Sequence, residues 1–513
     1  MKHSKYSKKR VIKSLQSCCA VVAAGLFIST VFPDAALASD NNPKIDYGLT
    51  AGFSSMSINN THFGLGQLDV SYLPKDIARS EAYIAPSANL LWKTADSGTI
   101  YGGLRGVGSI TRGDGDSWGL TAGEHHLYTP IDNTHTIDVL VGEKRSYLNL
   151  DKAYLGWKSG DKISFLDKDG LDISVGKQNF QLADGMVLTD GNDEASPHKG
   201  IYWLDPRTAW NNTAIVRLKS LPYQLELFYL QSNSYLLDLP YGGFTGDVYR
   251  DDIVGGNFEL VDKKLGKVGV SYFKVVSSNN EASLSLDNPG RDGLSVIGIH
   301  GRGNPVSTLK NLELAGEVDF QKNNTGTITR DARAWFAEAK YFMPSLPWYP
   351  TLGYRYSAFS GDKRSTTNKN EGWDYLYNGS TERGFGYWYQ GIVVGTYETR
   401  LSNLNTHFVN LTLIPPVKGG WMKVFYYNYQ FDETSSAGMT NTVVSSNKFA
   451  SEWDVVLGYS PTQKVDYMLI YGNAKPAQGG IDRVSGTIGP GNYPVGTNDR
   501  HTTMLQFTML YHL

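Results

Sequence analysis

The stretch PTLGYRYSAFSGD, residues 350–362, carries the pattern that decides the predicted fold. Leu352, Tyr354 and Tyr356 alternate with smaller or polar residues, among them Arg355, and Ser360-Gly361-Asp362 ends the run. Strict alternation of apolar and polar residues predicts a strand with two different faces. We therefore expect a strand that presents its aromatic residues to an apolar surrounding and Arg355 to the opposite side.

The residues that follow extend this pattern into a rhythm. A long polar stretch contains WDYLYNG (373–379) and WYQG (388–391), and a second alternating run follows at 406–413. Pro415-Pro416 then predicts a tight turn before another strand over 421–430. Strand, long loop, strand, tight turn and strand is typical of an outer-membrane barrel with long extracellular loops and short periplasmic turns.

Four short motifs in this part of the chain resemble the alginate-export family of outer-membrane porins. They are YRY with FSGD (354–362), WDxLYxG (373–379), SNL (402–404) and, upstream, Gly176-Lys177-Gln178, where Lys replaces the family's usual Arg. The resemblance covers about residues 171–431. It implies a barrel of 18 strands and the export of an alginate-type polyuronate.

The first 38 residues read as a signal peptide. A basic leader precedes an apolar core, Cys18–Phe32, and Ala36-Leu37-Ala38 is a typical cleavage site. Cleavage would remove both cysteines and leave 42 basic and 49 acidic residues, a net charge of −7. We therefore expect no disulfide and no nucleic-acid partner.

The composition of residues 39–513 favours one all-β domain. Glycine (55) and tyrosine (32) are abundant, and no segment after Phe32 approaches the roughly 20 apolar residues of a membrane helix. Between 16 and 20 short alternating segments can be counted, a range that includes the 18 strands of the family. The sequence predicts a transmembrane antiparallel β-barrel.

The C-terminal segment supports the same prediction. Leu505, Phe507, Met509, Tyr511 and Leu513 lie on one face of a final strand. This pattern resembles the assembly signal of bacterial outer-membrane barrels, which usually ends in Phe. We expect the assembly machinery of the outer membrane to be a partner of this chain.

Alternation also predicts which charged side chains point into the barrel. The cations expected inside are Arg105, Arg217, Lys219, Lys340, Arg355 and Lys423, and the motif likeness adds Lys177 and Gln178 to the pore-lining set. Strict alternation from Ile173 and Val175 aims Lys177 outward, unless a bulge at Gly176 changes its direction. The same rule places acids inside, including Glu226, Glu313, Glu317, Asp319, Glu338, Glu452, Asp454 and Asp466.

The loop that begins at Ser360 is long enough to fold into the channel mouth. Its candidate constriction residues are Asp362, Trp373, Asp374 and Arg383. We expect these side chains to narrow the path available to a solute.

Other functions leave weaker signals. Two acidic groups, Asp114/Asp116/Glu124 and Asp190/Asp193/Glu194, and the pair His125-His126 match no defined metal-binding spacing. No G-x-S-x-G motif is present, so a hydrolase is disfavoured. A receptor with 22 strands would need a plug domain before the first strand, and the N-terminal region offers none.

The sequence therefore predicts a channel without enzymatic activity or cofactor, integral to the outer membrane of a Gram-negative bacterium. It would pass anionic or carbohydrate-like solutes passively. The alternatives are a secreted soluble β-protein that binds glycans and an outer-membrane hydrolase. Oligomeric state and direction of transport are left open.

Overall fold

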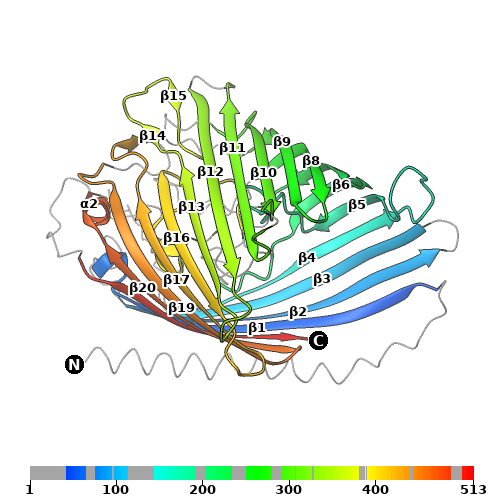
Figure 1. Ribbon diagram of the computed structural model, residues 1–513, viewed down its shortest axis with the longest axis horizontal. Helices are drawn as coiled ribbons and strands as arrows, with labels where there is room; N and C mark the ends of the chain where they lie inside the picture. Colours follow the sequence, from blue (N-terminus) through cyan, green and yellow to red (C-terminus); the bar gives the residue numbers. More distant parts are fainter. Residues whose placement is uncertain are drawn as a thin grey trace, which may run out of the picture.

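Eighteen long strands, each antiparallel to its neighbours, form one closed sheet in a computed structural model of the chain (Figure 1). They are β1 (Lys44–Asn59), β2 (Ile77–Thr94), β3 (Gly98–Gly113), β4 (Lys144–Lys158), β5 (Leu171–Gln178), β6 (Trp210–Ser220), β7 (Tyr223–Gln231), β8 (Asp251–Asp262), β9 (Gly266–Ser278), β10 (Ser295–Gly303), β11 (Leu312–Asn323), β12 (Thr329–Phe342), β13 (Thr351–Phe359), β16 (Leu404–Leu413), β17 (Gly420–Gln430), β19 (Lys448–Thr462), β20 (Val465–Pro476) and β21 (Thr502–His512). The fold confirms the predicted 18-stranded antiparallel barrel.

The structure describes residues 42–64, 76–94, 98–113, 144–191, 203–233, 250–279, 290–306, 308–325, 328–379, 388, 390–437, 443–486 and 499–513. The predicted signal peptide, the acidic group 114–124, His125-His126, Asp193, Glu194 and Arg383 lie outside these residues.

The first and last strands close the barrel. β1 pairs with β21 over ten residues, from Thr50↔His512 to Asn59↔Thr503, and β1 also pairs with β2. The C-terminal strand predicted from the sequence is thus the strand that removes the open edge of the sheet.

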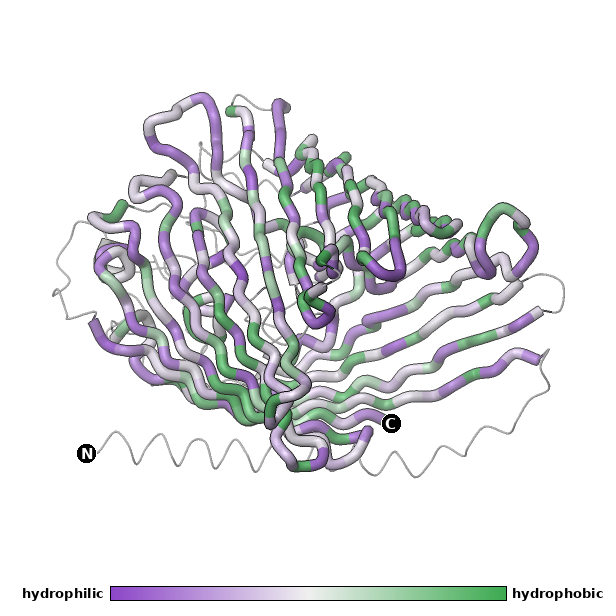
Figure 2. The backbone as a smooth tube through the Cα atoms, viewed as in Figure 1, coloured by the Kyte–Doolittle hydropathy of each residue, from purple (hydrophilic) through white to green (hydrophobic). Residues whose placement is uncertain are grey.

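On many strands apolar outward residues alternate with polar inward residues, and Figure 2 shows the resulting changes of colour along the chain. On β21, Leu505 and Phe507 are exposed to the outside, whereas Gln506 and Thr508 are buried inside. On β13, Leu352 and Tyr354 are exposed, and Arg355 is buried. Outward aromatic and aliphatic side chains with a polar interior are typical of a membrane barrel.

The two ends of the barrel differ in the length of their connections. At one end the connections are 95–97, 159–170, 221–222, 263–265, 304–311, 343–350, 414–419 and 463–464; at the other they include 60–76, 114–143, 179–209, 232–250, 279–294, 360–403, 431–447 and 477–501. The first set forms the short-turn end and the second the long-loop end. In outer-membrane barrels the short turns lie in the periplasm.

Short elements decorate the long-loop end. These are η1 (His62–Gly64), β14 (Asp362–Lys363) paired with β18 (Ser436–Ala437), β15 (Lys369–Asn370) against the start of β12, a π-helical turn η3 (Val394–Glu398) and α2 (Gln478–Gly486). Among the described residues, none of the helices is long and apolar enough to cross a bilayer.

Depth along the outer face gives a test of the strand assignment. Phe507 lies near the middle of β21 and Thr503 near its long-loop end, on the same outward face. Phe507→Arg should lower stability by about 2–4 kcal/mol and Thr503→Arg by about 0–1, because a cation costs most near the bilayer midplane. Heat-modifiable gel mobility and urea unfolding in lipid vesicles measure the difference. Equal effects of the two substitutions would show that β21 does not cross the bilayer as described.

Candidate functional site

Part of the long loop between β13 and β16, residues 360–403, lies inside the barrel. Its described segments carry fully buried side chains, including Trp373, Trp388, Val393 and Tyr397. These residues belong to the main hydrophobic cluster, together with inward residues of the wall such as Phe336 and Phe408. These described parts of the loop therefore pack within the channel, whereas β14 and β15 of the same loop lie at the long-loop end.

Two wall carboxylates hold the backbone of this loop. Glu452 on β19 accepts hydrogen bonds from the N–H groups of Val393 and Val394, each at 2.7 Å, and Asp454 accepts one from Ile392 at 3.2 Å. These N–H groups lie at the start of η3, away from any strand partner. The two acids thus satisfy donors that would otherwise be buried without a partner, which would cost free energy.

Arg355 on β13, three strands away from β19 in the wall, holds the same loop. Its guanidinium carbon lies 4.7 Å from the ring centre of Trp388 and 4.9 Å from that of Phe408. On the neighbouring inward position of β13, Ser357 accepts a hydrogen bond of 3.0 Å from the side chain of Gln390. The cation stabilises the packed loop through its contacts with aromatic faces.

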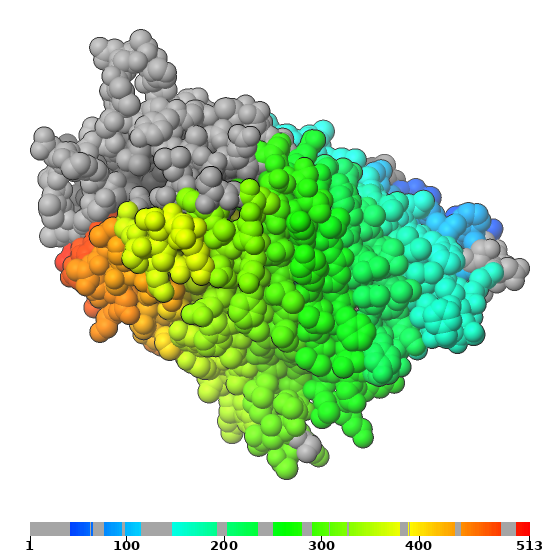
Figure 3. All heavy atoms as spheres, turned by 90° about the horizontal axis from the view of Figure 1, so that it is seen from above, coloured from blue at the N-terminus to red at the C-terminus, as the bar shows by residue number. Residues whose placement is uncertain are grey.

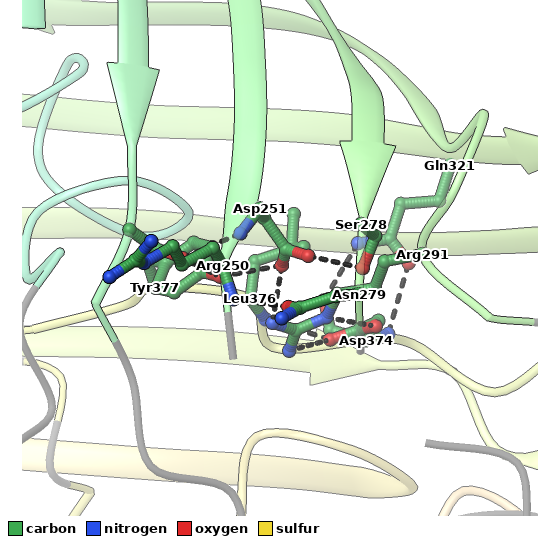
Figure 4. Close-up of polar contacts among 10 residues, drawn as sticks. Arg250, Asp251, Ser278, Asn279, Arg291, Gln321, Asp374, Leu376 and Tyr377 are labelled. Atoms are coloured by element: carbon green, nitrogen blue, oxygen red, sulfur yellow. Dashed lines mark hydrogen bonds and ion pairs between the residues drawn. The ribbon is translucent and has the colours of Figure 1, made fainter. Parts of the chain in front are cut away.

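A buried ionic network fixes the first half of the loop (Figure 4). Arg291 makes a bidentate contact with Asp374, at 2.8 and 3.0 Å, and a third contact of 3.1 Å with Asp251. Tyr377 donates to the same carboxylate of Asp251 at 2.5 Å, and Gln321 exchanges two hydrogen bonds with the backbone of Asp374. One loop is therefore tied to β8, β11 and the β9–β10 connection at once.

Asp374 is charged in this setting in spite of its burial. Burial alone would raise its pKa, but the Arg291 and Arg330 guanidiniums, together with hydrogen bonds, outweigh that effect and lower the pKa to about 2. A depressed pKa in the folded state means that the carboxylate contributes stability above its ordinary pKa and loses that contribution as the pH falls through about 2.

A second inward loop, residues 179–191 after β5, meets the first. The backbone N–H of Tyr377 donates a hydrogen bond of 3.0 Å to the carbonyl of Val187. The carbonyl of Tyr377 accepts one of 2.8 Å from the backbone N–H of Thr189. The indole of Trp388 donates to the carbonyl of Asp184 at 2.7 Å. Together these two loops form an inner constriction, defined here as residues 179–191 with 371–379 and 388–398.

Most predicted pore-lining cations do lie on the inner face. Arg105 and Arg217 form ion pairs of 2.6 Å with Asp151 and Glu226, and Lys340 lies 2.9 Å from Glu338. Lys219 shares the inward face of Arg217, and Lys423 lies 5.3 Å from the ring centre of Trp421. Arg355 also points inward, but it is fully buried under Trp388 and offers no surface to a passing solute.

The structure corrects the pore-lining assignment of Lys177, whereas Gln178 points inward as the alternation predicts. Lys177 pairs with Ala153 on the face that carries Leu155 and Val175, so it points outward. Gln178 points inward but is buried and bonded to Ser174 and Thr213 at 3.0 and 2.7 Å. A register shift between Gly176 and Gln178 is present, with Gly176 at a φ of +118°, yet it leaves Lys177 outside.

The predicted constriction residues fall into two groups. Trp373 and Asp374 are buried in the inner constriction, as described above. Asp362 is buried in the β14–β18 pair and accepts the N–H of Glu371 at 2.8 Å, so it shapes the loop and does not face the path.

The inward cations missed from the sequence include Lys158 on β4, Lys267 on β9 and Arg302 on β10. Lys267 lies 2.9 Å from Glu259, and Arg302 lies 3.7 Å from both Glu313 and Asp184 of the inner constriction. The alternation Val268, Val270, Tyr272 would have placed Lys267 inside, had it been extended by one residue. In the described part of the chain, no group of three His, Cys, Asp or Glu side chains could hold a metal ion.

Comparison with known proteins settles the family. The sequence profile described as "Alginate export" matches residues 132–478, about two thirds of the chain. This chain belongs to the alginate export family. It is therefore a β-barrel of the Gram-negative outer membrane that transports solutes as a porin.

Solved structures similar to this member of the alginate export family are porins of Pseudomonas aeruginosa. They include OccK9 (OpdG), with a TM-score of 0.48, OpdK with vanillate, at 0.47, and OccK5 (OpdH), at 0.45. Each is 12% identical, with 91% of this chain and 98% of the other covered. No curated protein matches the sequence.

Releasing the loop from Glu452 should open the channel. Glu452→Gln replaces one of the two carboxylate oxygens that accept from Val393 and Val394 by an NH2 group, so one charge-assisted bond, worth about 1.5–3 kcal/mol, is lost. We expect higher and noisier single-channel conductance in planar bilayers. Glu226→Gln is the control, because Glu226 is a wall acid with Arg217, not the loop, as its ion-pair partner. Identical conductance of the two variants would contradict the anchoring role of Glu452.

Acid should have a related effect through Asp374. Conductance should stay constant down to about pH 4 and rise reversibly towards pH 2, as protonation weakens the contact with Arg291. Asp374→Asn should show the raised conductance already at pH 7, whereas Asp482→Asn on α2, whose carboxylate is bonded to Ser445 and Gln478, should not. If the conductance of Asp374→Asn at pH 7 equals that of the wild type, the contact between Asp374 and Arg291 does not anchor the loop.

Proposed function

We propose that this porin passes anionic saccharides, of the carboxylate-bearing type found in alginate-like polyuronates, and that they enter at the short-turn end. One observation carries the proposal. In the ion pairs of the inner wall, the cation is repeatedly the more exposed partner, although acids and cations are similar in number.

Four pairs illustrate the difference in exposure. The side-chain exposures are 41% against 16% for Lys158 and Asp172, 42% against 17% for Arg217 and Glu226, 36% against 9% for Lys267 and Glu259, and 20% against 1% for Lys340 and Glu338. The acids lie against the wall and the cations face the water.

Side-chain length explains this asymmetry. Lys and Arg carry their charge on long apolar stems that can lie along the wall while the head group reaches solvent. Asp and Glu are shorter, so their charge stays close to the backbone. A solute in the channel therefore meets ammonium and guanidinium groups first, and guanidinium groups bind carboxylates in a bidentate manner.

The position of these cations suggests the side of entry. Lys158 and Arg217 lie at the ends of β4 and β6, and Lys267 lies at the start of β9, next to the turn 263–265. All three belong to the short-turn end, which faces the periplasm in this architecture. Attraction of an anion to that end supports uptake from the periplasm, as an exporter requires.

The triple variant Lys158→Gln/Arg217→Gln/Lys267→Gln tests the proposal. It leaves the partner acids in place, so the reversal potential in a salt gradient should shift towards cation selectivity. Block of the current by oligouronates added on the short-turn side should weaken several-fold, while block by neutral oligosaccharides of equal length should not change.

The double variant Lys448→Gln/Lys475→Gln is the matched control, because both lysines are exposed on the long-loop half of the outer face. It should behave as the wild type. An unchanged reversal potential and unchanged oligouronate block in the triple variant would remove the case for an anion path and leave the barrel itself intact.

A further inference from the structure

Three cations gather on the outer face of the barrel near its long-loop end: Lys274 on β9, Lys322 on β11 and Arg333 on β12. All three are exposed. Ser295 on β10 pairs with Lys274 on one side and with Lys322 on the other, and Phe320 pairs with Arg333. With adjacent strands about 4.8 Å apart, the backbones of the two lysines lie about 10 Å from each other. We call these three residues the outer cation patch.

The two lysines lie one outward step above a row of apolar side chains, and Arg333 lies at the end of that row, next to Phe320. Moving one outward step towards the short-turn end, the paired residues are Tyr272, Ile297 and Phe320, and each is exposed. The β8–β12 part of the wall forms a continuous surface in Figure 3. The patch therefore occupies the level at which lipid head groups of the outer leaflet meet the hydrocarbon.

Asp331 on β12 lies beside this patch and partly offsets the charge of Lys322 and Arg333, but its ion-pair partner is Lys369. Within the described residues, none of its three side chains has a carboxylate within 4.0 Å as an ion-pair partner. Asp331, which pairs with Lys322 across the strands, has its carboxylate 2.8 Å from Lys369. Asp252, the outward acid on β8, accepts hydrogen bonds from Tyr229 and Gln231.

Charged side chains at a lipid boundary need a counter-charge or water. Clusters of Lys and Arg at a membrane interface attract anionic lipid head groups, and Arg binds phosphate in a bidentate manner. In the outer leaflet of a Gram-negative outer membrane, the abundant phosphorylated lipid is lipopolysaccharide. We propose that the outer cation patch binds the phosphates of the lipopolysaccharide head group, whose acyl chains lie along Tyr272, Ile297 and Phe320.

The test compares two sets of outer-face cations. Wild type, Lys274→Gln/Lys322→Gln/Arg333→Gln and the control Lys448→Gln/Lys475→Gln are purified in mild detergent from the same membranes. The lipopolysaccharide retained per barrel is then measured by its sugar content and by native mass spectrometry. The triple variant should retain at least about threefold less lipopolysaccharide per barrel than the wild type, and the control should retain the same amount as the wild type.

Reconstitution then identifies the chemical group that is bound. Purified barrels, stripped of lipid, are titrated with intact lipid A, with dephosphorylated lipid A and with phosphatidylglycerol. Intact lipid A should bind the wild type more tightly than the other two lipids, and this preference should be absent from the triple variant.

Three outcomes would overturn the proposal. The first is that the triple variant and the control retain equal amounts of lipopolysaccharide. The second and third are that the wild type binds dephosphorylated lipid A, or phosphatidylglycerol, as tightly as intact lipid A. Heat-modifiable mobility of each variant checks that the barrel is folded, so a loss of lipid cannot be attributed to misfolding. Channel selectivity plays no part in these measurements.

Discussion

A strand at the edge of an open sheet exposes a row of backbone N–H and C=O groups, and each such group costs several kcal/mol in hydrocarbon. The pairing of β1 with β21 removes that cost by closing the sheet. Everything else in this porin depends on that closure. Once β1 and β21 have paired, one face of every strand faces lipid and the other faces the lumen.

The same requirement acts a second time inside the barrel. The loop 360–403 brings backbone into an interior where water is displaced by Trp373, Trp388 and Val393. Its N–H groups at 392–394 cannot be satisfied by a strand, so Glu452 and Asp454 accept them. Inner wall charge thus has two uses in this fold: some groups hold the loop, and others face the solute.

Much of the fold could be predicted from the sequence, because the period of two is a local property of the strand. Alternation gave the inward direction of Arg217 and Lys340, and it also aimed Lys177 outward, where the register places it. The motif likeness drew Lys177 into the pore-lining set, and there the prediction was wrong. A family motif shows where along the chain a residue lies. The pleat of the strand determines whether its side chain points to the lipid or to the lumen.

The channel contents could not be predicted in the same way. Whether Arg355 faces water or an indole depends on where Trp388 lies, and that depends on contacts such as Val394 with Glu452, far apart in the sequence. Sequence periodicity contains no information on such contacts. The difference in exposure within each wall ion pair likewise emerges only from the folded geometry. This pairing makes the attraction of the wall for anions sensitive to ionic strength, because the field of a pair of opposite charges is dipolar and short in range. With a Debye length of about 8 Å in physiological salt and about 3 Å at 1 M, the attraction is confined to solutes that travel close to the wall, and concentrated salt abolishes it.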